Sequence, residues 1–158
     1  MRRKCYFKSP IGVLCLEEEG NCVVGIYPGT EGVEDSVSET VLLKQAKQQL
    51  QEYFDGIRTE FTLPLKPVGT DFQRKVWKAL QLIPYGETRS YKEIACQIGS
   101  PGAARAVGSA NNKNPILILI PCHRVVGTDG KMVGFAWGLD AKEYLLNLEK
   151  GKKGKGIE

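Results

Sequence analysis

The sequence predicts an α+β protein made of two parts, a small unit of sheet and helix followed by a mainly helical unit. Three observations support this prediction. Short apolar runs separated by turn residues fill about the first 30 positions, helical periodicity dominates after position 40, and a stretch with two prolines at 63–69 cannot sustain a helix. The chain has 158 residues, of which 42% are hydrophobic, enough to bury a core. We expect domains at 1–67 and 70–150 and a flexible tail at 151–158.

The first unit should contain three antiparallel strands and one helix. Turn residues at 9–12 and 20–21 separate three apolar runs, which lie at Cys5 to Phe7, Val13 to Leu16 and Val23 to Tyr27. Over 41–54 the apolar residues recur at helical spacing, namely at Leu42, Leu43, Ala46, Leu50 and Tyr53. This helix is expected to pack on the sheet.

The second unit opens with a strongly signalled helix. Thr70 is a suitable N-cap with Gln73 three residues later, and Pro84-Tyr85-Gly86 ends the segment. Its apolar residues, Phe72, Val76, Trp77 and Leu80, share one face.

Two short helices joined by a tight turn should follow. Ser90 to Glu93 has the capping-box pattern and Gly99 closes that helix, while Ser100-Pro101 is expected to cap a second helix running through Ala103 to about Ala110. This spacing is typical of a helix-turn-helix, although a hairpin that only packs in the core has the same pattern. The second helix carries mostly Gly, Ala and Ser, with Arg105 as its one long cation. Such a narrow helix could enter the minor groove of DNA with Arg105 reaching the base stack; alternatively, its alanines pack on a neighbour and Arg105 is solvated.

Charge and cysteine content restrict the function classes. Residues 1–69 carry 8 Lys and Arg against 10 Asp and Glu, a net charge of −2, whereas residues 70–158 carry 14 against 8, a net charge of +6. The second half is therefore the better partner for a polyanion. Five widely spaced cysteines without a CxxC motif predict reduced thiols and no metal site. No apolar run is long enough to cross a membrane, so a cytoplasmic protein is expected.

The chemistry should lie at Cys122. An apolar run at 116–120, expected to be a buried strand, ends at Pro121 and presents Cys122 beside the only histidine, His123. A nucleophilic cysteine needs a base to take its proton, and in an extended chain His123 would reach the sulfur through a water or a local bend. The other cysteines, Cys5, Cys15, Cys22 and Cys96, fall in strand or helix patterns and are read as structural.

A carboxylate behind His123 would orient the imidazole. Asp140 to Glu143 reads as a capping box, and the helix that it opens should turn Tyr144, Leu145 and Leu148 inward and place Glu149 at its end, within reach of His123.

The segment Pro121-Cys122-His123-Arg124-Val125 resembles the signature of the methylated-DNA-protein-cysteine methyltransferases, also called 6-O-alkylguanine-DNA alkyltransferases. The similarity extends from about Asp71 to Glu149 and includes Ser90-Tyr91, 103–108, Asn114-Pro115 and 134–139. It implies a ribonuclease-H-like first domain and a winged helix-turn-helix in the second. The implied function is DNA repair by one irreversible transfer of an alkyl group from 6-O-alkylguanine, and also from 4-O-alkylthymine, to Cys122.

The resemblance also implies residue roles. Cys122, His123 and Glu149 would form a water-linked relay, Asn114 would hold the active-site turn, and Tyr91 would turn the nucleotide and protonate the leaving guanine. Arg105 would fill the gap in the base stack, and the positions matching backbone contacts are Lys92, Ser100 and Thr128. The substrate pocket would comprise Met132, Phe135, Ala136 and Trp137. Double-stranded DNA bound through its minor groove is the implied partner of a monomer without cofactor.

Two residues depart from the common family pattern. Many members have glycine where this chain has Trp137, and some have serine where it has Ala136. A bulky indole at position 137 should narrow the pocket, so methyl should transfer much faster than benzyl-sized groups when the two free modified guanines are compared. If Trp137 instead packs away from the pocket, no such preference is expected.

Three other functions agree less well with the sequence. A cysteine hydrolase would turn over repeatedly and would not place its nucleophile and base next to each other before a DNA-binding-like hairpin at 128–130. A relative that only recognises damaged DNA usually lacks the cysteine. A transcriptional regulator would need polar side chains on its recognition helix.

Overall fold

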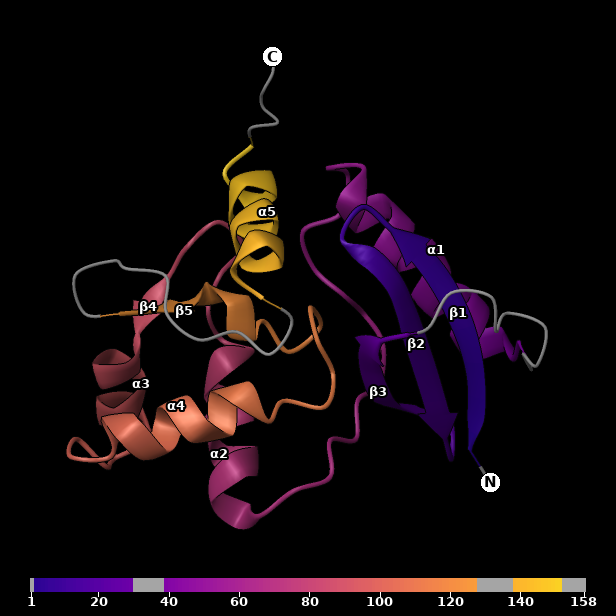
Figure 1. The fold of residues 1–158 in the computed structure, drawn as a ribbon. Helices are drawn as coiled ribbons and strands as arrows, with labels where there is room; N and C mark the ends of the chain where they lie inside the picture. The colour runs from indigo at the N-terminus through magenta and orange to yellow at the C-terminus, as the bar shows by residue number, and fades with distance from the viewer. Residues whose placement is uncertain (1, 30–38, 128–137, 152–158) are drawn as a thin grey trace. The chain divides into compact units, whose positions relative to one another are not determined.

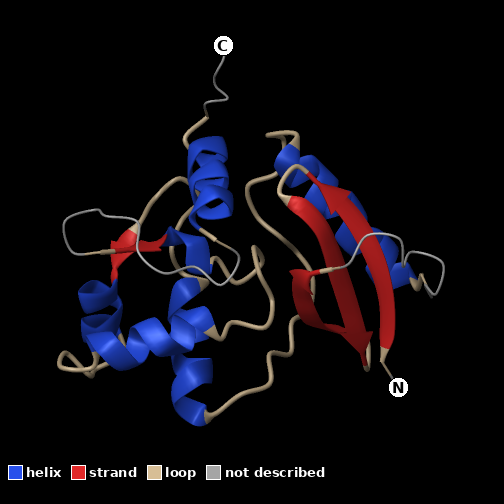
Figure 2. Cartoon of the chain, viewed as in Figure 1, coloured by secondary structure: helices blue, strands red, loops and turns tan. Residues whose placement is uncertain are grey.

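The computed structural model describes residues 2–29, 39–127 and 138–151, and it divides into two compact units (Figure 1). The boundary falls between residues 68 and 69, and residues 115–117 return to the first unit. Figure 2 shows the difference in composition: the first unit carries the three-stranded sheet, and the second is mainly helical.

The first unit has the predicted elements. Strands β1 (Arg3–Ser9), β2 (Gly12–Glu19) and β3 (Cys22–Pro28) form an antiparallel sheet in chain order, and helix α1 (Val41–Phe54) follows. Cys5 pairs with Leu16 and Phe7 with Leu14, so these four buried side chains lie on one face of the sheet. That face meets α1, because the rings of Phe7 and Phe54 stack with centroids 6.3 Å apart.

The proline-containing stretch at 63–69, which was expected not to be helical, is partly paired with the sheet. The N–H of Val23 donates to the carbonyl of Pro64 at 2.8 Å, and the N–H of Lys66 donates to the carbonyl of Val23 at 2.9 Å. Further along the same strand, Ile26 makes equivalent bonds with Pro115 and Leu117 at 2.9 and 3.0 Å. Two chain segments therefore cover the β3 edge, which would otherwise expose unpaired backbone groups.

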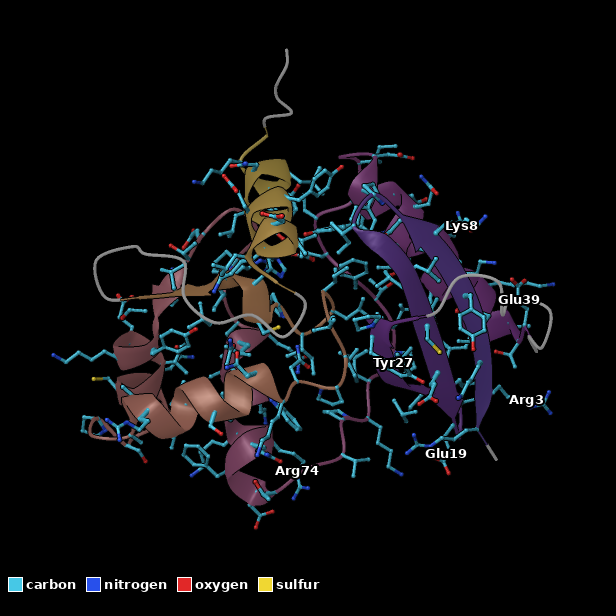
Figure 3. The ribbon with its side chains drawn as sticks, viewed as in Figure 1. Arg3, Lys8, Glu19, Tyr27, Glu39 and Arg74 are labelled. Atoms are coloured by element: carbon cyan, nitrogen blue, oxygen red, sulfur yellow. The ribbon has the colours of Figure 1, made fainter. Side chains whose placement is uncertain are left out.

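A polar cluster that includes Tyr27, which Figure 3 labels, lies on the other face of the sheet. The hydroxyl of Tyr27 donates to Oε2 of Glu17 at 2.8 Å and accepts from the thiol of Cys15 at 3.3 Å. Arg2 pairs with the same carboxylate at 3.1 Å. These bonds satisfy Glu17 although it is buried, and they agree with a structural reading of Cys15.

The second unit begins with helix α2 (Asp71–Leu80), followed by strand β4 (Arg89–Ser90) and helix α3 (Tyr91–Gln97). Two of the three predicted capping boxes are present in these helices: Thr70 exchanges hydrogen bonds with Gln73, and Ser90 with Glu93. Gly99 ends the turn of α3 at φ +82°, a conformation that favours glycine. Helix α4 (Ala104–Asn112), strand β5 (Val125–Val126) and helix α5 (Leu139–Glu149) complete the unit, with β4 and β5 parallel.

Helix α4 begins later than the sequence predicts. Its N-cap is Ala103 rather than Ser100, and no side chain of the described residues caps it. The N–H of Ala103 instead donates to the carbonyl of Ser100 at 2.9 Å, which makes Pro101 the second residue of a β-turn. Proline is as well suited to that turn position as to the start of a helix, and here the turn is formed.

Helix α5 begins earlier than predicted, and its buried face is different. Gly138, at φ +107°, is the N-cap, so the proposed cap at Asp140 is wrong. Tyr144 is 40% exposed and Leu148 is only half-buried, whereas the buried positions are Ala141, Lys142, Leu145, Leu146 and Glu149. The helix therefore buries a lysine on the stripe that was expected to be apolar, together with the glutamate that was expected to reach His123.

The run 116–120 is buried but is not a continuous strand. Ile116 forms an isolated bridge with Ile26, and the chain then turns at Ile118, whose φ is +72°. A β-branched residue in the left-handed region is strained, so the surrounding packing must hold this turn in place. Cys96, which was expected to be structural, is exposed. Across the described residues, no helix is both long and apolar enough to span a membrane.

Candidate active site

Cys122 lies in a tight turn rather than at the end of an extended strand. Residues Cys122–Arg124 form one turn of 3-10 helix, in which the N–H of Arg124 donates to the carbonyl of Pro121 at 3.0 Å. Cys122 is 1% exposed and His123 is fully buried. Because the chain bends here, the side chains of Cys122 and His123 do not point to opposite sides as they would in an extended strand.

Two asparagines fix this turn, Asn111 near the end of α4 and Asn114 just after it. Nδ2 of Asn114 donates to the carbonyl of Ile120 at 2.7 Å, and the same side chain hydrogen-bonds the thiol of Cys122. Nδ2 of Asn111 donates to the carbonyl of Cys122 at 3.4 Å. Both asparagines are buried. Asn114 was among the expected residues, whereas Asn111 was missed because it lies near the end of the small-residue helix without any motif of its own.

Glu149, at the end of α5, lies against His123, as predicted from the sequence. Nε2 of His123 and Oε2 of Glu149 are 2.6 Å apart, and the side chains of both residues are fully buried. The Arg124 guanidinium donates two hydrogen bonds to the same carboxylate, from Nε to Oε1 at 2.7 Å and from Nη2 to Oε2 at 3.0 Å. A bidentate pair of this kind fixes both the position and the orientation of the carboxylate.

Arg124 is a site residue that the sequence reasoning missed. Its Nη1 donates to the carbonyl of Ile83 at 2.6 Å, and its guanidinium carbon lies 5.7 Å from the centre of the Tyr85 ring. The backbone N–H of Gly86 adds a weak bond of 3.4 Å to Glu149. The loop after α2 therefore helps to hold the carboxylate behind His123. The sequence feature that could have identified Arg124 as a site residue is its position directly after Cys122 and His123.

The charges at this pair follow from burial and from these bonds. Burial lowers the pKa of His123, although Glu149 opposes this effect, so the imidazole is neutral at rest. Burial alone would raise the pKa of Glu149, but the hydrogen bonds and charges of His123 and Arg124 outweigh it and bring the pKa to about 2. An ionised carboxylate only accepts hydrogen bonds, so Nε2 of His123 carries the proton and Nδ1 is left as an acceptor.

The Cys122 thiol is protonated at rest. Burial raises its pKa to about 11, against the opposing effects of the Asn114 hydrogen bond and the Lys142 charge. A thiolate must therefore be made when it is needed, by a base that takes the proton.

Lys142 is the second charged residue that the sequence reasoning missed. It is fully buried, and its Nζ donates to the carbonyl of Val125 at 2.6 Å, next to the cysteine turn. Burial lowers its pKa to about 8, while an interaction with Cys122 acts to raise it. A positive charge so placed favours the thiolate. The signal was its helical spacing with Leu145, Leu146 and Glu149, all on the buried stripe of α5.

A groove of about 510 Å³ lies along α3 and α4. It is lined by Tyr91, Lys92, Pro101, Ala104, Arg105, Gly108 and Gly127. Burial raises the pKa of the half-buried Tyr91, and Cys122 adds to this effect, which links the groove to the thiol. Arg105 and Lys92 are exposed. Ser100 is not among these lining residues; its N–H donates to the carbonyl of Ala95 at the end of α3.

The remaining expected site residues, Thr128, Met132, Phe135, Ala136 and Trp137, and the hairpin expected at 128–130 lie outside the described residues. Within the part of the chain that the structure describes, no group of three or more His, Cys, Asp or Glu side chains could hold a metal ion.

The unfolding free energy should fall in two steps as the solution is acidified. The unfolded chain protonates its histidine near pH 6.5, whereas buried His123 resists the proton, so stability falls as the pH drops below 6.5. Ionised Glu149 contributes fully to the unfolding free energy above its ordinary pKa of 4.5, and that contribution is lost as the pH falls toward 2. Urea unfolding at a series of pH values measures both steps. A free energy that stays constant through both ranges would contradict the arrangement of these charges.

Comparison with known proteins assigns both units to one family. A family model described as the DNA binding domain of 6-O-methylguanine DNA methyltransferase matches residues 71–151, and one described as its ribonuclease-like domain matches residues 2–67. The chain is 53% identical over 148 residues to the methylated-DNA–protein-cysteine methyltransferase of Methanosarcina barkeri, which covers 90% of this chain and 94% of the relative.

Solved structures agree. The crystal structure of Mycobacterium tuberculosis O6-methylguanine methyltransferase matches with a TM-score of 0.86 and 47% identity over 96% of this chain and 94% of that one. M. tuberculosis OGT in complex with DNA matches with a TM-score of 0.86 and 48% identity over 94% and 92% of the two chains. These matches confirm the resemblance and the fold class expected from the sequence. Because the two matched domains span nearly the whole chain, the protein belongs to the 6-O-methylguanine DNA methyltransferase family.

Proposed function

We propose that this protein repairs DNA by transferring the alkyl group of 6-O-alkylguanine to Sγ of Cys122. The observation that carries the proposal is the environment of that sulfur. Cys122 is held by Asn114 in a rigid turn, is followed by a histidine paired at 2.6 Å with a buried carboxylate, and interacts electrostatically with a groove residue, Tyr91. Repair of alkylated DNA by transfer to a protein cysteine is the activity of the family.

The transfer is an in-line displacement. The sulfur forms a bond to the alkyl carbon while the bond from that carbon to the guanine oxygen breaks. The thiol proton passes to His123, whose imidazolium form is stabilised by Glu149, and the Tyr91 hydroxyl protonates the guanine ring nitrogen. The proton on His123 then restores the Tyr91 hydroxyl through solvent. The product is a thioether on Cys122, which has no easy leaving path, so each molecule should act once.

The damaged base must leave the helix before it can react. In a stacked pair, the alkyl carbon is not accessible for in-line attack by a protein sulfur, so the nucleotide has to be rotated out. The narrow α4 surface, which includes Ala104 and Gly108, suits an approach to the minor groove, and exposed Arg105 is placed to enter the base stack. Lys92, which also lines the groove, and Ser100 would contact the phosphate backbone. Binding should therefore weaken with added salt.

The test is intact-mass analysis of the protein before and after incubation with a duplex that contains one 6-O-methylguanine. We expect a single addition of about 14 Da, one methyl replacing one hydrogen, mapped to the Cys122 peptide and stopping at one equivalent. Cys122→Ala should remain unmodified, and Cys96→Ala, which removes an exposed cysteine, should react like the wild type. Binding of the lesion without any mass change would show a damage-recognition protein instead, and repeated turnover would show a hydrolase.

A further inference from the structure

Two buried polar atoms beside Cys122 have no hydrogen-bond partner among the described residues. They are Oδ1 of Asn111 and Nδ1 of His123. Asn111 is 1% exposed and His123 is 0% exposed, so bulk water does not satisfy either atom. Both residues adjoin the nucleophile, because Asn111 bonds the Cys122 carbonyl through Nδ2 and His123 follows Cys122 in the chain. Buried polar atoms without partners are rare, and each one requires a reason.

Both atoms are acceptors. The Cys122 carbonyl can only accept, so the Asn111 atom facing it is the amide nitrogen and the remaining atom is the oxygen. The proton of neutral His123 is on Nε2, facing Glu149, which leaves a lone pair on Nδ1. Two acceptors cannot bond each other, but one water molecule can donate a hydrogen to each and still accept from a third group.

The family resemblance already implies a water that links Cys122 to His123 in the relay. We propose that Asn111 is a positioning residue for that water, which its Oδ1 holds together with Nδ1 of His123 while the water receives the Cys122 proton. This inference rests on the proposed function, because alkyl transfer is what the relay would serve. The water accepts the thiol proton and at the same time releases one of its own protons to Nδ1, so that its composition is unchanged. Throughout the transfer its other hydrogen stays on Oδ1 of Asn111, which prevents the water from turning away from the imidazole.

The charges around His123 fit a proton that enters at Nδ1. Glu149 lies at Nε2 and stabilises the imidazolium, whereas Arg124 and Lys142 oppose it. The thiolate left on Cys122 is in turn favoured by Asn114 and Lys142. Since His123 faces these two cations, the imidazolium form needs an acceptor on its Nδ1 side. Asn111 provides that acceptor through the water without adding a negative charge.

The chain has a single histidine, which makes the test direct. Protein labelled with ¹⁵N-histidine gives one pair of imidazole signals, whose pH dependence reports the protonation of His123. Three variants are compared with the wild type: Asn111→Leu removes the acceptor at similar volume, Asn111→Asp makes it anionic, and Asn112→Leu alters the exposed neighbour on the same helix as a matched control. Rates of single methyl transfer from the lesion-containing duplex are measured on the same proteins.

Asn111→Leu should lower the pKa of His123 and slow methyl transfer roughly tenfold or more, since the imidazolium loses a charge-assisted hydrogen bond. Asn111→Asp should raise the pKa of His123, and Asn112→Leu should match the wild type in both measurements. Any pattern in which the leucine and aspartate variants do not shift this pKa in opposite directions overturns the proposal, because mere loosening of the turn would affect both variants alike. Failure of the wild type to accept methyl would reject the proposed function, while the imidazole titration would still decide the role of Asn111.

Discussion

Replacing Glu149 by glutamine should slow alkyl transfer about a hundredfold or more and lower the unfolding free energy by about 3–5 kcal/mol. Glutamine keeps the shape of the side chain but removes the buried anion, which leaves Arg124 charged and without its carboxylate in the interior. Removing one partner of a buried ion pair is costly for this reason. Transfer slows because the imidazolium of His123 loses the anion that stabilises it.

The measurements are urea unfolding at neutral pH and single-turnover methyl transfer. Glu143→Gln is the matched control, because Glu143 is exposed on the same helix and should change neither quantity appreciably. In the Glu149 variant, the more acidic of the two stability steps should also disappear. Wild-type stability in Glu149→Gln would mean that the ion pair with Arg124 does not hold this part of the fold together.

Replacing Lys142 by methionine should separate activity from stability. Methionine fills a similar volume and removes an ammonium whose burial is costly, so the unfolding free energy should stay within about 1 kcal/mol of the wild type. Methyl transfer at neutral pH should slow by about tenfold for each unit by which the pKa of Cys122 rises. The rate should recover as the pH is increased, because the lost charge only shifts the thiolate population.

The readouts for this variant are urea unfolding and the pH profile of the transfer rate, with Lys150→Met as the control because Lys150 is exposed at the end of the same helix. A large fall in stability would mean that the bond from Lys142 to Val125 is mainly structural. An unchanged pH profile would mean that the Lys142 charge does not act on Cys122.

The sequence predicted the elements whose signals are local. The capping boxes at Thr70 and Ser90 both form, because each one requires only residues three positions apart. The same kind of pattern failed at Asp140, where Gly138 starts the helix two residues earlier, and at Ser100, where a β-turn precedes the helix. In those two places another local structure competes for the same residues, and sequence reasoning had no means of ranking them.

The site was only partly predictable. Cys122, His123 and Glu149 could be named because a nucleophile, a base and an orienting acid are required together, and only one histidine is available. Three site residues were not predicted because their hydrogen-bond partners lie in distant segments of the chain. Arg124 bonds the Ile83 carbonyl, Lys142 bonds the Val125 carbonyl, and Asn111 bonds the cysteine turn. Charged residues are usually on the surface, so a fully buried lysine on α5 ran against the ordinary expectation.

The burial of Cys122 also bears on how long an unused molecule stays active. Peroxides oxidise thiolates that are accessible, and a molecule that transfers only once has no later turnover in which to recover from such a loss. A sulfur that is 1% exposed, with a pKa raised to about 11, stays in the unreactive thiol form between encounters with damage. Exposed Cys96 is the more accessible target for oxidants, so its oxidation can leave the repair capacity of the molecule intact.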